Sequence, residues 1–105
     1  MKIIKQRKKI LHQLQVSGSA DALTFTNLAV IATIQGNEIE AADFAREAIA
    51  QESFNPHAHF LLARSYEVQG DLEQALKEAT IAVEQQDTET YVQYKGYLES
   101  KIQTR

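Results

Sequence analysis

Residues 22–35 contain no charged side chain, and large apolar residues occur along the whole segment. These residues are Leu23, Phe25, Leu28, Val30, Ile31 and Ile34. A helix that is apolar on all sides has to be covered nearly everywhere, either by its own protein or by a partner. The pattern therefore predicts a helix with more apolar surface than one neighbouring helix can bury.

Two later segments place small residues at helical spacing among charges. The alanines lie three or four residues apart, at Ala41, Ala45 and Ala48 and again at Ala75, Ala79 and Ala82. Residues at this spacing share one stripe of a helix, and small side chains let a second helix approach closely. Each segment is therefore predicted to be an amphipathic helix whose alanine stripe packs against a partner helix.

The two alanine segments are related by an offset of 34 residues, which also holds outside them. It pairs Gly36 with Gly70, Leu28 with Leu62, Ala29 with Ala63 and Asn37 with Asp71. Each glycine stands where a helix must end in a left-handed turn, and Asn37 or Asp71 can then cap the next helix. Glu40 and Gln74 complete the spacing of a capping box. The chain is thus predicted to repeat a helix-turn-helix unit.

The first helix of each unit also has a recognisable start. Asn55 is a suitable cap before Pro56, the single proline of the chain, whose missing N–H costs nothing in a first helical turn. The earlier helix follows the short loop "SGSAD", in which Ser19 or Asp21 is available as its cap.

These positions resemble the tetratricopeptide repeat, a 34-residue helical hairpin with the pattern W-x2-L-G-x2-Y, A-x3-F and P. In residues 56–89 the matching places hold His59, Leu62, Ala63, Tyr66, Ala75 and Ala79. In residues 22–55 they hold Phe25, Leu28, Ala29, Ala32, Ala41 and Ala45. The closing proline is replaced by Ser53 and Asp87. The resemblance implies an all-α, right-handed array of helical hairpins, a TPR-like α-solenoid that serves as a protein-binding scaffold or adaptor.

The repeat register extends in both directions. It aligns Leu11 and Leu14 with Ala45 and Ala48. Residues 1–17 are therefore predicted to contain a basic N-terminal helix, which covers residues 3–16. This helix would correspond to the second helix of a leading unit. Residues 90–105 are predicted to form a C-terminal capping helix, in which Tyr94, Tyr97 and Leu98 match the packing positions only if one residue is inserted. About six antiparallel helices in one domain, residues 1–105, are expected.

Charge is distributed unevenly along the chain. Residues 1–16 carry five basic residues and no acidic one, whereas residues 17–105 carry six basic and fourteen acidic residues. The basic arm comprises Lys2, Lys5, Arg7, Lys8 and Lys9. Its cations are expected to form a hydrated face of the terminal helix or to pair with the acidic residues of the rest of the chain. The alternative is that they bind nucleic acid or an anionic membrane. Without a long apolar run, the protein is expected to be soluble and cytoplasmic.

The sequence shows no motif that indicates catalysis. Cysteine is absent, and the chain has no glycine-rich phosphate loop, no nucleophile elbow and no HExxH metal motif. His57 and His59 are two residues apart and so point in different directions from a helix, while His12 stands alone. We therefore expect neither enzymatic activity nor a metal site nor a cofactor.

The resemblance implies that the concave face of the array is lined by set positions of each first helix. In the first unit these positions hold Leu23, Thr26, Asn27, Val30, Thr33 and Ile34. In the second unit they hold His57, Phe60, Leu61, Arg64, Glu67 and Val68. The expected groove is mostly apolar, and Asn27 and Arg64 would orient what binds there.

Three occupants of this groove are considered. The preferred one is a peptide or partner helix; the others are a second copy of the chain and the chain's own C-terminal helix, through Tyr91, Tyr94 and Leu98. Members of the resembled family that bind the acidic C-terminal tails of chaperones use a clamp of lysine, asparagine and arginine. The clamp places hold Thr26, Val30 and Leu61 here, so binding of chaperone C-terminal tails is not expected.

Overall fold

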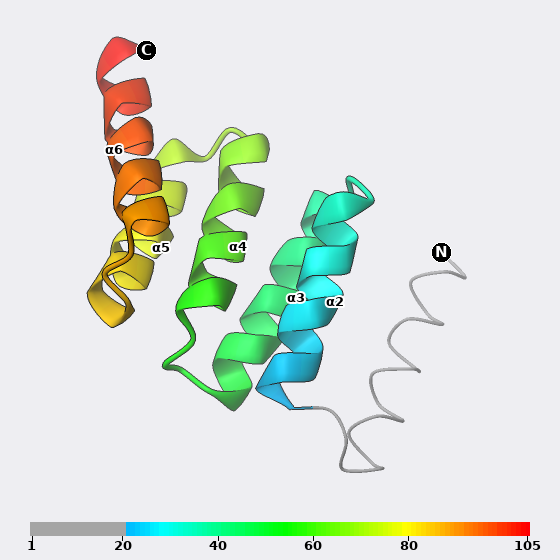
Figure 1. The fold of residues 1–105 in the computed structure, drawn as a ribbon. Helices are drawn as coiled ribbons and strands as arrows, with labels where there is room; N and C mark the ends of the chain where they lie inside the picture. Colours follow the sequence, from blue (N-terminus) through cyan, green and yellow to red (C-terminus); the bar gives the residue numbers. More distant parts are fainter. Residues whose placement is uncertain (1–20) are drawn as a thin grey trace.

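The computed structural model describes residues 21–105, which form an all-helical array (Figure 1). Its helices are α2 (Ala22–Ile34), α3 (Glu38–Gln51), α4 (Pro56–Val68), α5 (Leu72–Gln85) and α6 (Glu89–Thr104). This described part contains five of the roughly six expected helices and no strand. The helix predicted over residues 3–16 and the whole basic arm lie outside the described residues.

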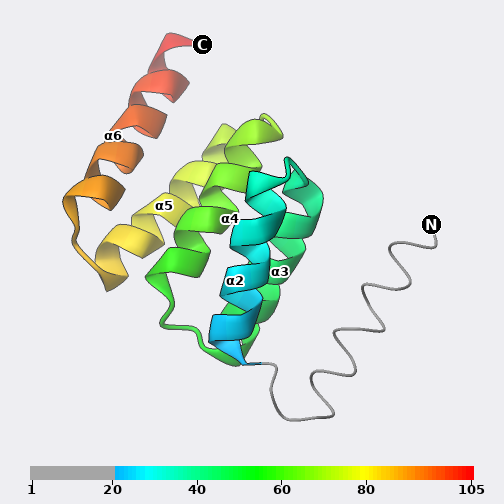
Figure 2. The same cartoon turned by 45° about the vertical axis from the view of Figure 1, so that its right-hand side comes forward.

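The helices are arranged in two layers. Helices α2 and α3 form one antiparallel hairpin and α4 and α5 another, and the hairpins pack through α3 against α4 and α2 against α4. Helices α2, α4 and α6 lie in one layer, and α3 and α5 lie in the other (Figures 1 and 2). Helix α6 packs on α5 and ends the array on the side away from α2. The two hairpins correspond to the two units expected from the 34-residue offset.

The turns inside both hairpins have the same backbone conformation. Gly36 and Gly70 have φ angles of +79° and +89°, in the left-handed region that glycine adopts without a steric cost. The N–H of Asn37 bonds to the Ala32 carbonyl, and that of Gly36 to the Thr33 carbonyl. The equivalent bonds recur at Gly70. This pair of hydrogen bonds is the Schellman motif, which satisfies the last free carbonyls of a helix.

The expected capping boxes did not form. In the Schellman turns, the backbone N–H groups of Asn37 and Asp71 already donate to backbone carbonyls. They are therefore not available to the side chains of Glu40 and Gln74, which a capping box would need. Asp71 still caps α5 by accepting a 3.3 Å hydrogen bond from the Gln74 N–H, but Asn37 makes no side-chain cap bond. Asp21 caps α2, accepting a 2.9 Å bond from the Thr24 N–H.

The alanine stripes lie in the core, as their spacing predicts. Ala41, Ala45 and Ala48 of α3 are fully buried beside Phe25 and Ala29 of α2. Ala75, Ala79 and Ala82 of α5 are buried equally well. The fully buried Leu98 of α6 extends this second core, together with Ala63 and Leu72. Small side chains thus let the two layers pack closely along the whole described array.

Hydrogen bonds from the loop between α3 and α4 join the two hairpins. The Asn55 side chain caps α4 by accepting from the Ala58 N–H at 3.1 Å, and its Nδ2 donates to the Thr26 hydroxyl at 3.2 Å. The Asn55 N–H donates to the Gln85 side chain at 2.9 Å. One loop residue therefore holds α2, α4 and α5 together.

Candidate binding surface

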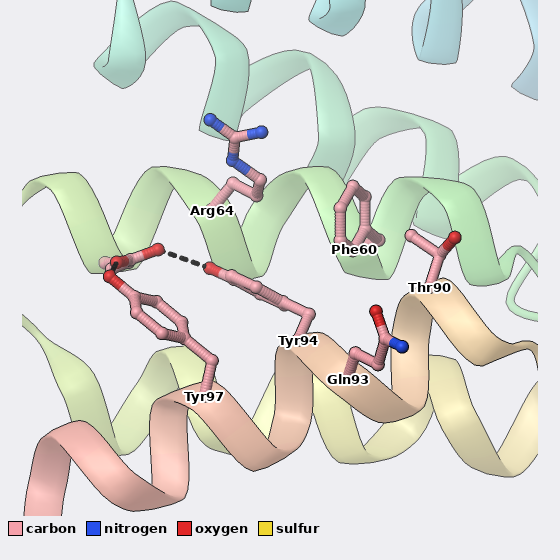
Figure 3. Close-up of a pocket in the computed structure, with 7 residues that line it drawn as sticks. Phe60, Arg64, Thr90, Gln93, Tyr94 and Tyr97 are labelled. Carbon is pink, nitrogen blue, oxygen red and sulfur yellow. Dashed lines mark hydrogen bonds between the residues drawn. The ribbon is translucent and has the colours of Figure 1, made fainter.

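A hollow of the described surface lies between α4 and α6. It has a volume of about 510 Å³ and takes its lining from both helices (Figure 3). We call it the α4–α6 pocket; it is lined by Phe60, Arg64, Glu67, Thr90, Gln93, Tyr94 and Tyr97. A second hollow of about 360 Å³ adjoins it at Phe60 and Thr90 and includes His57 and Tyr91. The two hollows follow the seam between the helices.

Aromatic rings form the apolar wall of the α4–α6 pocket. The Phe60 ring lies 5.1 Å from the Tyr91 ring and 5.2 Å from the Tyr94 ring, measured between centroids. The second pair meets edge to face, one of the arrangements that aromatic quadrupoles favour. The C-terminal helix therefore covers the part of the expected groove around Phe60, as one of the three alternatives foresaw, but it leaves an open pocket beside these rings.

Glu67 supplies the negative charge of the pocket, and α6 fully engages it. Its carboxylate accepts 2.8 Å hydrogen bonds from the hydroxyls of Tyr94 and Tyr97 and a 3.0 Å bond from the Lys101 ammonium. Partial burial acts to raise the pKa of Glu67, but these bonds and the Lys101 charge outweigh it and hold the pKa below its ordinary value. Glu67 therefore stays ionised, and its hydrogen bonds hold α6 against α4.

The same contacts set the ionisation of the partners of Glu67. Burial, followed by the hydrogen bond to the Glu67 carboxylate, raises the pKa of Tyr94 far above its ordinary value. The hydrogen bond to Glu67 also raises the pKa of Lys101. Tyr94 therefore remains a neutral hydrogen-bond donor and Lys101 a cation at physiological pH.

Within residues 21–105, Arg64 differs from Glu67 in having no hydrogen-bond or ion-pair partner. Its guanidinium is exposed, and in Figure 3 it points away from Tyr94 and from α6. Because Lys101 already neutralises Glu67, no acidic residue of the described part of the chain pairs with Arg64 at the edge of the aromatic wall. A carboxylate or phosphate is the group that a free guanidinium binds best.

The positions expected to line the groove separate into three groups. Exposed residues are Leu23, Asn27, Ile34, His57, Arg64 and Val68; Val30, Thr33, Phe60 and Glu67 are partly buried; and Thr26 and Leu61 are buried. Of these twelve, the α4–α6 pocket and its neighbour contain His57, Phe60, Arg64 and Glu67. Leu23 lines a separate hollow at the start of α2.

Two of the expected groove residues need correction, because a partner cannot reach them. Thr26 is only 5% exposed: its hydroxyl donates to the Ala22 carbonyl and accepts from Asn55. Leu61 is 6% exposed and belongs to the core with Phe44. Both face the contact between hairpins, which the sequence pattern did not distinguish from an open groove.

The repeat pattern did not predict Thr90, Gln93, Tyr94 and Tyr97 as part of the binding surface. A signal was present, because Tyr91, Tyr94 and Tyr97 are spaced by three residues and so lie near one another on a helix. That they meet Phe60 and Glu67 depends on how α6 packs, which this spacing alone does not reveal.

The two histidines within residues 21–105 have different surroundings. His59 is buried, and its Nδ1 lies 2.6 Å from the Glu78 carboxylate of α5, a contact that joins α4 to α5. His57 is exposed. Within residues 21–105, no three histidine, aspartate or glutamate side chains come together as a group that could hold a metal ion. No helix in the same part of the chain has both the length and the apolar character needed to cross a membrane.

No protein-family model matches the chain, and no curated protein shows significant sequence similarity to it. The tetratricopeptide resemblance therefore rests on the 34-residue period and the residues that match it.

Proposed function

We propose that the chain is a protein-interaction module, a scaffold or adaptor of the tetratricopeptide type, that binds a peptide or partner helix on the layer of α2, α4 and α6. The α4–α6 pocket is the proposed centre of binding. Its aromatic wall suits an apolar anchor side chain, and Arg64 suits an acidic group next to that anchor.

One observation supports this proposal above the others. Arg64 has no ion-pair partner among residues 21–105, whereas the carboxylate of the neighbouring Glu67 is held by hydrogen bonds from α6. An arginine that only served stability would gain from an ion pair with a nearby acid. The acid next to Arg64 is instead held by Lys101 and two tyrosines of α6. The free guanidinium and the adjoining rings together favour a ligand with an acidic residue close to an apolar one.

A peptide-display selection against the full chain tests this function. Selected peptides should combine an acidic and a large apolar residue, and their affinity should fall roughly tenfold or more in Arg64→Gln, since a hydrogen bond to a charged group contributes about 1.5–3 kcal/mol. Lys77→Gln is the matched control, because Lys77 lies exposed on α5 and its replacement changes the net charge equally. Equal binding by both variants would refute a role for Arg64.

The basic arm supports a second candidate function, binding of nucleic acid or of an anionic membrane. Five cations without an acid within sixteen residues give a strong local positive charge. Affinity for single-stranded RNA or for phosphatidylserine vesicles should then fall steeply with salt and disappear when Lys2, Lys5, Arg7, Lys8 and Lys9 are all replaced by glutamine. Apolar binding in the pocket should respond little to salt.

Self-association is the third candidate. Leu23, Ile34 and Val68 are exposed on α2 and α4, and apolar surface of this kind can pair with its own copy in a two-fold dimer. Sedimentation of the full chain over a wide concentration range tests this, because a dimer through these residues should dissociate in Ile34→Glu. Sedimentation as a monomer throughout excludes it.

A further inference from the structure

Within residues 21–105, no element covers the side of α2 that faces away from α4. Ile31 at its centre is 49% exposed, and Asn27, one turn earlier, is also exposed. Leu28 beside them is only half-buried. Large apolar side chains inside a helix normally lose this exposure to a neighbouring element, which residues 21–105 do not supply here.

The repeat itself shows what normally covers this position. Ser65 of α4 stands 34 residues after Ile31, and Leu98 of α6 stands a further 33 residues on. The second interval is one residue shorter because three residues connect α5 to α6 whereas four connect α3 to α4. The three residues therefore occupy equivalent places in α2, α4 and α6.

At two of these three places the side chain is completely buried by the preceding helix. Ser65 is 0% exposed and donates its hydroxyl proton to the Glu38 carbonyl of α3. Leu98 is 0% exposed and packs with Leu72, Ala75 and Ala79 of α5. Ile31 has no preceding helix among the described residues, and this explains its exposure.

The chain contains a segment of the right length and pattern to cover it. Residues 3–16 are predicted to be helical, and Ile4 and Leu11 precede Leu72 and Ala79 by two repeat periods. Those two residues of α5 are among the ones that cover Leu98. The connection also fits, because residues 17–21 would join the segment to α2, which is one residue more than the four, 52–55, that join α3 to α4. A connection of similar length can deliver the segment to the equivalent place.

Two of the cations in this register fall at positions that are open to water. Lys5 and Lys9 correspond to Ile39 and Asp43 of α3, which are both exposed. A helix placed like α3 would therefore keep these charges solvated while its apolar side faced α2.

Arg7 and Lys8 correspond instead to the buried Ala41 and Ala42. Long basic side chains tolerate such positions at the edge of a core, because their aliphatic stems lie over apolar surface while the charged ends reach water. All the charges can therefore remain hydrated in this arrangement.

We propose that residues 3–16 of the same chain pack as a helix on the outward side of α2, with Ile4 and Leu11 covering Ile31. The segment then occupies, beside α2, the place that α3 has beside α4. This arrangement is independent of what the α4–α6 pocket binds.

Disulfide trapping in the full chain tests the proposal directly, since the natural sequence has no cysteine to interfere. In the double variant Leu11→Cys with Ile31→Cys, the two thiols should lie close enough to form a disulfide within one chain. The matched control is Leu11→Cys with Val92→Cys, because Val92 is similarly exposed but lies on α6 at the other end of the array. We expect the first pair to oxidise at least about tenfold faster, as a fixed neighbour has the higher effective concentration.

The products of oxidation separate the possible occupants of this side of α2. A monomer with an internal disulfide supports the proposal, and equal oxidation rates of the two pairs overturn it. A disulfide-linked dimer also overturns it, because the segment would then lie on a second copy of the chain.

A second measurement does not depend on cysteine. Leu11→Asp should accelerate hydrogen exchange of α2 amides by about tenfold through easier local opening, with little change in α5. Lys9→Asp is the control, since Lys9 is placed towards solvent and its replacement should leave α2 protected. Unchanged exchange in Leu11→Asp contradicts packing of the segment on α2.

Discussion

The hydroxyl of Ser65 in α4 donates a 2.6 Å hydrogen bond to the backbone carbonyl of Glu38, in the first turn of α3. Ser65 is completely buried, and the two residues belong to different hairpins. A buried hydroxyl needs partners: the carbonyl of the adjacent helix accepts its proton, and its oxygen accepts a 3.1 Å hydrogen bond from the Gln69 side chain. The bond therefore fixes how deeply the second hairpin sits against the first.

Removing this hydroxyl should weaken the contact between the hairpins. Ser65→Ala should lower the free energy of unfolding by about 1–3 kcal/mol, because it removes the bonds to the Glu38 carbonyl and from Gln69, and one hydrogen bond contributes about 0.5–1.5 kcal/mol. Urea denaturation followed by circular dichroism measures the change. Ser100→Ala is the control, because Ser100 is exposed on α6 and its replacement should change stability by less than about 0.5 kcal/mol.

Replacement by alanine should change the stability of the fold in opposite directions at Gly36 and at Gly96. Gly36→Ala should destabilise the fold by about 1–2 kcal/mol, because a Cβ is unfavourable at a φ of +79°. Gly96 lies inside α6 with open space where a Cβ would be placed, so Gly96→Ala should stabilise by about 0.5–1 kcal/mol. Thermal unfolding of the two variants gives both signs, and a gain from Gly36→Ala would contradict the left-handed turn.

The close approach of the helix layers should not tolerate larger side chains. Ala63 is completely buried among Leu72, Ala75 and Leu98, so Ala63→Leu should destabilise by about 1–3 kcal/mol through overpacking. Ala50→Leu, at an exposed position of α3, provides the same change in volume without crowding. Comparable midpoints of urea unfolding for the two variants would argue against close packing at Ala63.

The Glu67 cluster predicts a specific dependence of stability on pH. The pKa of Glu67 is lower in the folded chain than its ordinary value of 4.5, so ionised Glu67 favours the folded state above that pH. This contribution should be lost as pH falls below 4.5 through the folded pKa. Wild type should therefore melt at a higher temperature than Glu67→Gln at pH 7, and the difference should shrink in acid. A constant difference across this range would show that the charge of Glu67 is not what stabilises the cluster.

The sequence predicted the helices and turns of the described array because local features determine them. Gly36, Gly70, Asp71 and Asn55 each act within a few residues of their own position, and each ends or begins a helix where expected. Asn37 was the exception: it precedes α3, but the backbone bond of the turn took the place of the cap that its side chain could have made.

The candidate site was harder to predict, because it depends on contacts between distant residues. Phe60 and Arg64 were recognised from the repeat positions, but their pocket exists only because α6 places Tyr94 and Tyr97 across from Glu67. These contacts join residues about 30 positions apart, and their register depends on a linker that is one residue shorter than its counterpart. No local pattern contains that information, and the burial of Thr26 by Asn55 was missed for the same reason.

The equivalent residues Ile31, Ser65 and Leu98 also make the helices non-interchangeable. Between α3 and α4 the central contact is a hydroxyl bonded to a carbonyl, whereas between α5 and α6 it is a leucine among apolar side chains. A serine moved to the second place would lose its acceptor, and a leucine moved to the first would collide with the backbone that the serine contacts. Duplication of a unit is therefore not enough to lengthen this protein, because every new junction would need its own matched pair of surfaces.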